Sequence, residues 1–214
     1  MSDPAVQWVA TTLFGALSVY SLWRLMTSRH PLAGTGHLFH LGMNLVMVAM
    51  VWPWWARLPM LPQVAFFVAG AAGFAAAAGW YGLDAPSRGR TPDGRRAGHH
   101  ESARCQATHA VMMLAMVWAL AVMTRHGGHA AAHVAEHAAA AVPLDAPTAA
   151  AGAVLAVLLV VGGALFLVAA VRHARGGDRV GLDRAGLDRA GLDLLTGGLM
   201  SLGTAAMCGL MLAG

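Results

Sequence analysis

Long runs of apolar residues dominate this chain, and most charged residues lie between these runs. A transmembrane helix needs about 20 consecutive apolar residues to cross the hydrocarbon core of a bilayer. The runs lack the two-residue alternation of barrel strands, so we expect helices in all of them. Six runs are long enough, at about residues 6–26, 38–55, 62–82, 105–123, 148–171 and 194–213.

This pattern predicts an all-α fold, an integral membrane bundle of about six transmembrane helices forming a single membrane domain over residues 1–214. Composition supports it, because charged residues make up only 11% of the chain, against about 25% in typical soluble proteins. We therefore expect a multi-pass protein of the cell membrane, surrounded by lipid, with no nucleic-acid partner. The sequence leaves open a homo-oligomer or a partner subunit in a membrane complex.

The basic residues indicate the orientation of the bundle, because arginine accumulates on the cytoplasmic side of membrane helices. Twelve of the fourteen arginines flank the first, third and fifth connections, and only Arg57 and Arg125 lie elsewhere. We therefore predict that these three connections are cytoplasmic and that both termini lie outside. The fifth connection also carries the sequence Gly-Leu-Asp-Arg-Ala twice, at residues 181–190, which we interpret as a charged spacer.

Two histidines lie within the predicted spans and open the same motif, His-x-x-Met-x-Leu-x-Met. An ionisable residue inside a membrane is unfavourable there, and it therefore suggests a functional role. Helical geometry places the histidine and the methionines three and seven residues later along one face. The two motifs supply the candidate residues His40, Met43, Met47, His109, Met112 and Met116.

Methionine is unevenly distributed among the predicted spans. Ten of the twelve methionines after Met1 fall in the second, fourth and sixth spans, and the third and fifth spans contain none. Thioether and imidazole groups together form a soft ligand set that suits Cu(I) and suits Mg²⁺ or Ca²⁺ poorly. The first functional hypothesis is therefore a protein that binds or handles copper through these three helices, with Cys105 as a further soft ligand one turn before His109.

Two other hypotheses account for part of the same pattern. Methionine is a flexible packing residue, so the chain could be a non-catalytic accessory or assembly subunit. Haem b held by His40 and His109 is the less favoured cofactor, because bis-histidine ligation leaves the methionines unexplained. No Ser-His-Asp set, phosphate-binding loop or paired-carboxylate site is present in the sequence, and we expect no enzymatic activity.

A second group of histidines lies in the fourth connection, which we predict to be outside. His129, His133 and His137 are spaced four residues apart, so they would share one face if the segment were helical. Two histidines one turn apart can share a divalent metal ion. The alternative is a solvated histidine-rich loop without a metal.

At the two His-x-x-Met-x-Leu-x-Met motifs the chain resembles an actinobacterial family of small multi-pass membrane proteins, which is described as a domain of unknown function. The methionine-rich second and fourth spans, the arginine-rich middle connection and the overall length fit this resemblance. It implies membrane location and the general organisation of the helices, and it implies no mechanism.

Overall fold

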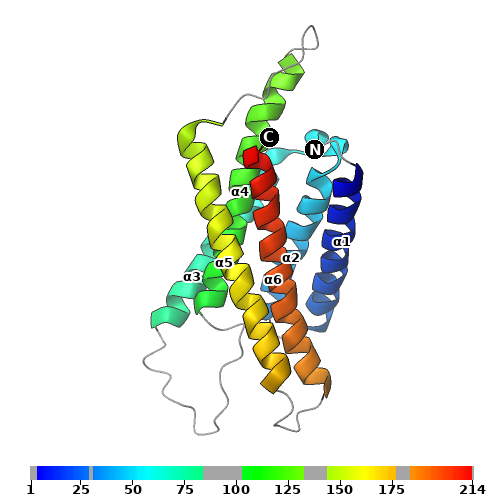
Figure 1. Cartoon of the computed structure of the whole chain (residues 1–214), viewed down its shortest axis with the longest axis vertical. Coiled ribbons are helices and arrows are strands. Elements are labelled where there is room, and N and C mark those ends of the chain that lie inside the picture. Colours follow the sequence, from blue (N-terminus) through cyan, green and yellow to red (C-terminus); the bar gives the residue numbers. More distant parts are fainter. Residues whose placement is uncertain (1–3, 29–30, 84–102, 133–143, 177–183, 214) are drawn as a thin grey trace. The chain divides into compact units, whose positions relative to one another are not determined.

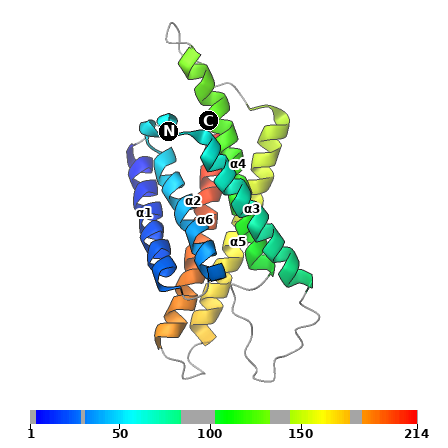
Figure 2. The same cartoon turned by 180° about the vertical axis from the view of Figure 1, so that it is seen from behind.

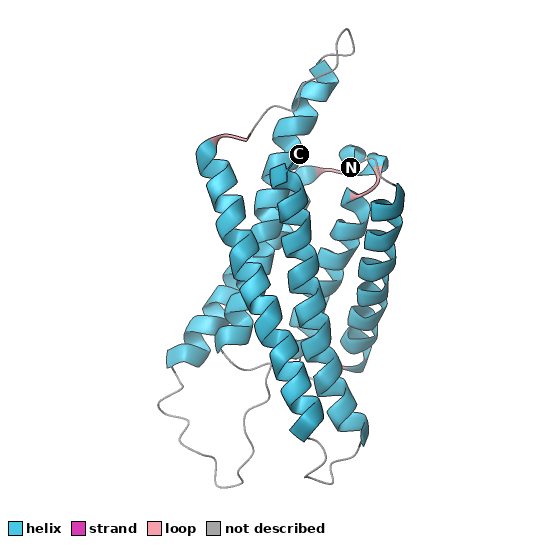
Figure 3. Cartoon of the chain, in the orientation of Figure 1, coloured by secondary structure: helices cyan, strands magenta, loops and turns pink. Residues whose placement is uncertain are grey.

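The computed structural model describes residues 4–28, 31–83, 103–132, 144–176 and 184–213. Within these ranges the chain forms six α-helices, one short 3-10 helix and no strand (Figures 1 and 3). The elements are α1 Pro4–Thr27, α2 Pro31–Met50, η1 Pro53–Arg57, α3 Met60–Leu83, α4 Ala103–Ala132, α5 Ala146–Gly176 and α6 Arg184–Ala213. The predicted all-α class is confirmed.

Five of the described helices are long and apolar enough to cross a membrane. Their candidate spans are Pro4–Thr27, Met60–Leu83, Ala103–Thr124, Ala146–Arg175 and Ala190–Ala213. Helix α2, which carries the polar side chains of His37, His40 and Asn44, is not among the five. The helices as a set identify a membrane protein, and the outside position of the termini stays a prediction.

Helix α2 ends a few residues before the carboxyl end of the second predicted span. Helix α2 ends at Met50 and the 3-10 helix follows at Pro53–Arg57, whereas the prediction continued the span to residue 55. Proline lacks a backbone N–H and its ring clashes with the preceding turn, so α2 cannot continue through Pro53. The tryptophans around this proline are apolar, so the apolar run in the sequence continues past the residue at which helix α2 ends.

Other helix ends also differ from the predicted spans. Helix α3 begins at Met60, so the third membrane helix does contain one methionine. Helix α6 begins at Arg184, which places the second copy of the five-residue repeat in a helix instead of a spacer. Alanine and leucine favour helix in this repeat, and the apolar segment after it propagates the same helix.

The chain divides into two compact units, residues Met1–Phe67 and Val68–Gly214, and each is described by itself. In the first unit α1 packs along α2 (Figure 2). The Trp52 indole N–H donates to Thr11 Oγ1 at 3.1 Å, and Asn44 Nδ2 donates to Ser21 Oγ at 3.5 Å. These bonds pair polar groups that would otherwise be costly to place among apolar helices. The prediction of a single membrane domain stays a prediction.

In the second unit the most extensive helix–helix interface is between α5 and α6, which run antiparallel (Figure 1). A Cβ atom added to Gly163 would lie 3.2 Å from the Gly198 carbonyl oxygen, and one added to Gly198 would lie 3.3 Å from the Gly163 carbonyl oxygen. Ser201 Oγ donates to the Leu159 carbonyl at 2.7 Å across the same interface. Small residues allow such close backbone approach, and packing of this kind drives helix association in lipid.

Helix α4 of the same unit packs against α5 and α6. The Trp118 indole N–H donates to the Thr148 carbonyl at 3.0 Å, and the same ring lies against Gly152, where an added Cβ would clash with it. Near the other end of the interface, Thr108 lies against Gly162. Glycines on α5 thus bring α4 close enough to bury the side chains of its inner face.

Candidate functional site

The predicted ligands lie on two helices that belong to different units. His40, Met43 and Met47 lie on α2 in the first unit. His109, Met112 and Met116 lie on α4 in the second unit. A site that combines the two histidines therefore stays a prediction, and each group is described within its own unit.

On α2 the two motif methionines are buried and the motif histidine is half-buried. Met43 and Met47 have exposed fractions of 0% and 1%. The His40 ring lies edge-on to the His37 ring, with a centroid distance of 6.5 Å. Asn44, between the two methionines, is also buried and bonds to Ser21. This face therefore combines imidazole, thioether and amide groups on one helix.

On α4 the motif histidine is more deeply enclosed. His109 is 4% exposed, and its Nε2 atom lies 3.4 Å from the Sγ atom of Cys105, one helical turn earlier. The Phe166 ring of α5 stacks on the imidazole at a centroid distance of 5.6 Å and an interplanar angle of 28°. The Phe74 ring of α3 lies 5.3 Å away at 46°. Aromatic contacts of this kind fix the ring plane and exclude water from the nitrogen that faces Cys105.

The soft donors of α4 share one face of the helix. At about 100° per residue, Cys105, His109, Met112 and Met116 fall within an arc of about 60°. All four are buried. Cys105 also packs with Phe166 and Leu194, which joins this face to α5 and α6. One continuous line of thiol, imidazole and thioether groups therefore runs through the buried side of a candidate membrane span.

Helix α6 supplies further buried groups, one of which the sequence interpretation missed. Met200 and Met207 are buried, and Thr204 Oγ1 donates to the Met200 carbonyl at 2.8 Å. Asp193 is only 8% exposed and lies inside the Ala190–Ala213 span. The predicted sixth span began one residue after it, so this carboxylate was assigned to the connection. A carboxylate amid leucines at a span boundary is the signal that could have found it.

The arrangement restricts which metal ions are suitable. Among the described residues, no three His, Cys, Asp or Glu side chains come together in a way that could hold a metal ion. Zn²⁺ sites in proteins are built from three or four such ligands.

The outer histidines lie mostly beyond what the structure describes. The α4 helix continues to Ala132, so the backbone at His129 is helical, as the predicted helical spacing requires. His133 and His137 lie outside the described residues. The metal-collecting role of this cluster stays a prediction.

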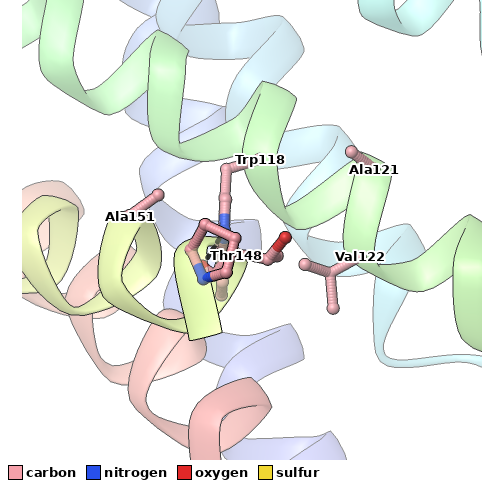
Figure 4. Close-up of a pocket in the computed structure, with 6 residues that line it drawn as sticks. Trp118, Ala121, Val122, Thr148 and Ala151 are labelled. Carbon is pink, nitrogen blue, oxygen red and sulfur yellow. Dashed lines mark hydrogen bonds between the residues drawn. The ribbon is translucent and has the colours of Figure 1, made fainter. Parts of the chain in front are cut away.

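A pocket of about 270 Å³ lies between α4 and α5, near Trp118 (Figure 4). Its lining residues are Trp118, Ala121, Val122, Pro147, Thr148 and Ala151. None of these side chains titrates or is a metal ligand, so the pocket adds no chemistry to the donor face of α4.

Comparison with known proteins gives a family and two named relatives. Uncharacterized protein Mb0995 of Mycobacterium bovis and Uncharacterized protein Rv0970 of Mycobacterium tuberculosis are each 30% identical to this chain over 124 residues. These residues are 56% of this chain and 51% of each relative, so the match spans about half the length of the relatives. No solved structure matches the chain significantly. Residues 33–211 match the family described as Domain of unknown function (DUF5134), and the chain belongs to that family.

Proposed function

We propose that this protein binds Cu(I) within the membrane through soft ligands in each of its two units. These are His40, Met43 and Met47 on α2 in the first unit, and His109, Met112 and Met116 on α4 in the second. Its role in this proposal is to bind and pass on the metal ion, without catalysis. The outer histidines His129, His133 and His137 would then collect metal ions before they enter the membrane.

The observation that carries the proposal is the burial of His109 together with Met112 and Met116. Their exposed fractions are 4%, 0% and 0%, and they share one face of a candidate span. Burying an imidazole costs free energy unless a partner compensates for the lost water. Cys105 Sγ, 3.4 Å from His109 Nε2, is one such partner. A soft monovalent cation is a ligand that imidazole nitrogen and thioether sulfur can bind together.

The neutral charge of these ligands also supports Cu(I) over a divalent ion. Imidazole and thioether carry no charge, so the bound state has only the single charge of the ion. The free energy of placing an ion in a low-dielectric interior rises steeply with its charge. A monovalent ion is therefore less unfavourable there than a divalent one.

A second candidate function is that of an accessory or assembly subunit in which the methionines only pack the helices. Complete burial of Met43, Met47, Met112 and Met116 favours this alternative as well, because methionine fills irregular gaps between helices. In the first function the methionine sulfur atoms bind Cu(I), and in the second the methionines only pack the helices. Substitution of methionine by leucine distinguishes the two functions.

The test is a Cu(I) titration of the purified protein against a competing Cu(I) chelator, with the Met112→Leu/Met116→Leu double variant in parallel. Leucine keeps the apolar volume and costs less than about 1.5 kcal/mol per site, but it removes the thioether. We expect the wild type to bind Cu(I) and the double variant to bind it at least about tenfold more weakly, on the scale of losses seen at metal sites.

Met26→Leu is the matched control, because Met26 is 78% exposed on α1. It should bind Cu(I) as the wild type does. If the wild type, the double variant and Met26→Leu bind Cu(I) with equal affinity, the α4 methionines only pack the helices. A Soret band in the purified protein that disappears in His109→Ala would identify haem instead of copper.

A further inference from the structure

The contact between Cys105 and His109 on α4 places two strong soft ligands side by side inside a candidate membrane span. We propose that these two residues form the primary Cu(I) site of the second unit, with Cys105 binding as a thiolate and Met112 as an additional donor. This inference rests on the proposed function, and it names the ligands that supply most of the Cu(I) affinity. The histidine and methionine motif alone does not include the cysteine.

The geometry of the pair fits a shared metal ion. Metal–sulfur bonds of about 2.3 Å and metal–nitrogen bonds of about 2.0 Å, taken at the angle of about 110–120° found with three or four ligands, separate the two donor atoms by about 3.5–3.7 Å. The observed distance between Cys105 Sγ and His109 Nε2 is 3.4 Å. An ion can therefore join these atoms with little movement of the backbone, and the helix itself holds the spacing.

The charge balance favours this site over one made from neutral ligands alone. When Cu(I) binds, the Cys105 thiol releases its proton to water and the S–H bond is replaced by an S–Cu bond, with no change in oxidation state. The thiolate charge cancels the charge of the ion. A neutral complex costs much less to bury than an isolated cation, so the thiolate should supply most of the affinity.

The surroundings of the pair protect such a complex. Phe166 and Phe74 lie against the imidazole ring, and Leu194 of α6 packs with Cys105 and Phe166. These apolar groups exclude water, which slows the oxidation of a thiolate-bound Cu(I) ion. Since no three His, Cys, Asp or Glu side chains come together in the described chain, the same pair is a poor site for Zn²⁺.

Cys208 offers a matched control within the same unit. It is also buried, with an exposed fraction of 1%, and lies in the Ala190–Ala213 span. The residues three or four positions from it on α6 are Thr204, Ala205, Met211 and Leu212. No imidazole therefore flanks it on its own helix. Replacing either cysteine by serine removes one buried thiol, but only Cys105→Ser removes the proposed ligand.

The experiment measures the Cu(I) affinity of the full-length wild type, Cys105→Ser and Cys208→Ser by competition with a chromophoric Cu(I) chelator. We expect one tight Cu(I) equivalent in wild type and in Cys208→Ser. The loss in Cys105→Ser should be at least about 100-fold, because even supporting residues of metal sites contribute about 10–100-fold. X-ray absorption at the copper edge of wild type should show both sulfur and nitrogen ligands, and this measurement does not require the variant to fold.

The outcomes separate this inference from the proposed function. If wild type and Cys105→Ser bind Cu(I) with equal affinity, the cysteine is not a ligand, although the protein still binds copper. A copper spectrum without nitrogen ligands would overturn the Cys105–His109 pair in the same way. If wild type binds no Cu(I), both the pair and the proposed function are wrong.

Discussion

At the residue scale, the orientation of the buried His109 imidazole depends on the side chains that contact it. Cys105 faces its Nε2 atom, and Phe166 stacks on its ring. The first contact is local to α4 and follows from a separation of four residues. The second joins α4 to α5, so the orientation of the ring depends on helix packing as well as on the sequence of α4.

Replacing Phe166 by leucine tests this orientation. The variant loses the ring stack, which contributes about 0.5–1.5 kcal/mol beyond the buried area, and it lets the imidazole rotate away from Cys105. We expect lower stability in detergent unfolding and Cu(I) affinity reduced by about tenfold, as for supporting residues of metal sites.

The control is Leu165→Ala on the same helix, because Leu165 is 60% exposed. Its unfolding and its Cu(I) affinity should stay close to those of the wild type. Unchanged affinity in Phe166→Leu would mean that the stack does not orient the imidazole.

At the element scale, close approach of backbones holds α5 to α6. Each of Gly163 and Gly198 lies near the carbonyl oxygen of the other, and their remaining neighbours are the leucines Leu202 and Leu167. Apolar side chains gain little from leaving lipid, so van der Waals contact and interhelical hydrogen bonds carry this association. Any group that separates the backbones should weaken it.

Gly198→Ala inserts a methyl group 2.9 Å from Leu167 Cδ2 and 3.3 Å from the Gly163 carbonyl oxygen. Overpacking of this size costs about 1–3 kcal/mol, and we expect this loss in the free energy of unfolding, measured in mixed micelles of mild and denaturing detergent.

Gly209→Ala on the same helix is the control, because nothing lies within 4 Å of its added Cβ. It should be neutral or slightly stabilising, since alanine favours helix over glycine by about 1 kcal/mol. Equal unfolding free energies for the two variants would contradict the close approach of α5 and α6.

At the scale of the whole molecule, the exposed surface of α5 is apolar over most of its length. Exposed large apolar side chains on this helix are Val154, Val157, Leu158, Val160, Val161, Leu165, Val168 and Val171. A soluble protein would not expose such a continuous apolar surface. The surface suits contact with lipid, and the arginines then determine which way the helices cross.

The predicted orientation can be tested with two new cysteines at exposed positions of the second unit. Both native cysteines are buried, so they report poorly on sidedness. Thr124→Cys near the end of the α4 span should react with an impermeant maleimide added outside intact cells, whereas Arg175→Cys at the end of the α5 span should react only after the membrane is opened. The reverse pattern would show that the termini are cytoplasmic.

Much of the α4 face could be predicted from the sequence because helical register is local. The spacing of His109, Met112 and Met116 already placed them on one side of a helix. The burial of Asp193 was missed for a different reason. Hydropathy averages over many residues, so it cannot assign a carboxylate at a span boundary.

Apolar run length and helix periodicity are properties of the sequence, and they were enough to predict the membrane class, the helical fold and the two histidine and methionine motifs. The folded structure was needed to show that Phe74 and Phe166 enclose His109, that Leu194 packs with Cys105 and Phe166, and that Gly163 meets Gly198. Such contacts join residues far apart in the chain. They depend on how side chains of different helices fit together, which local periodicity does not encode.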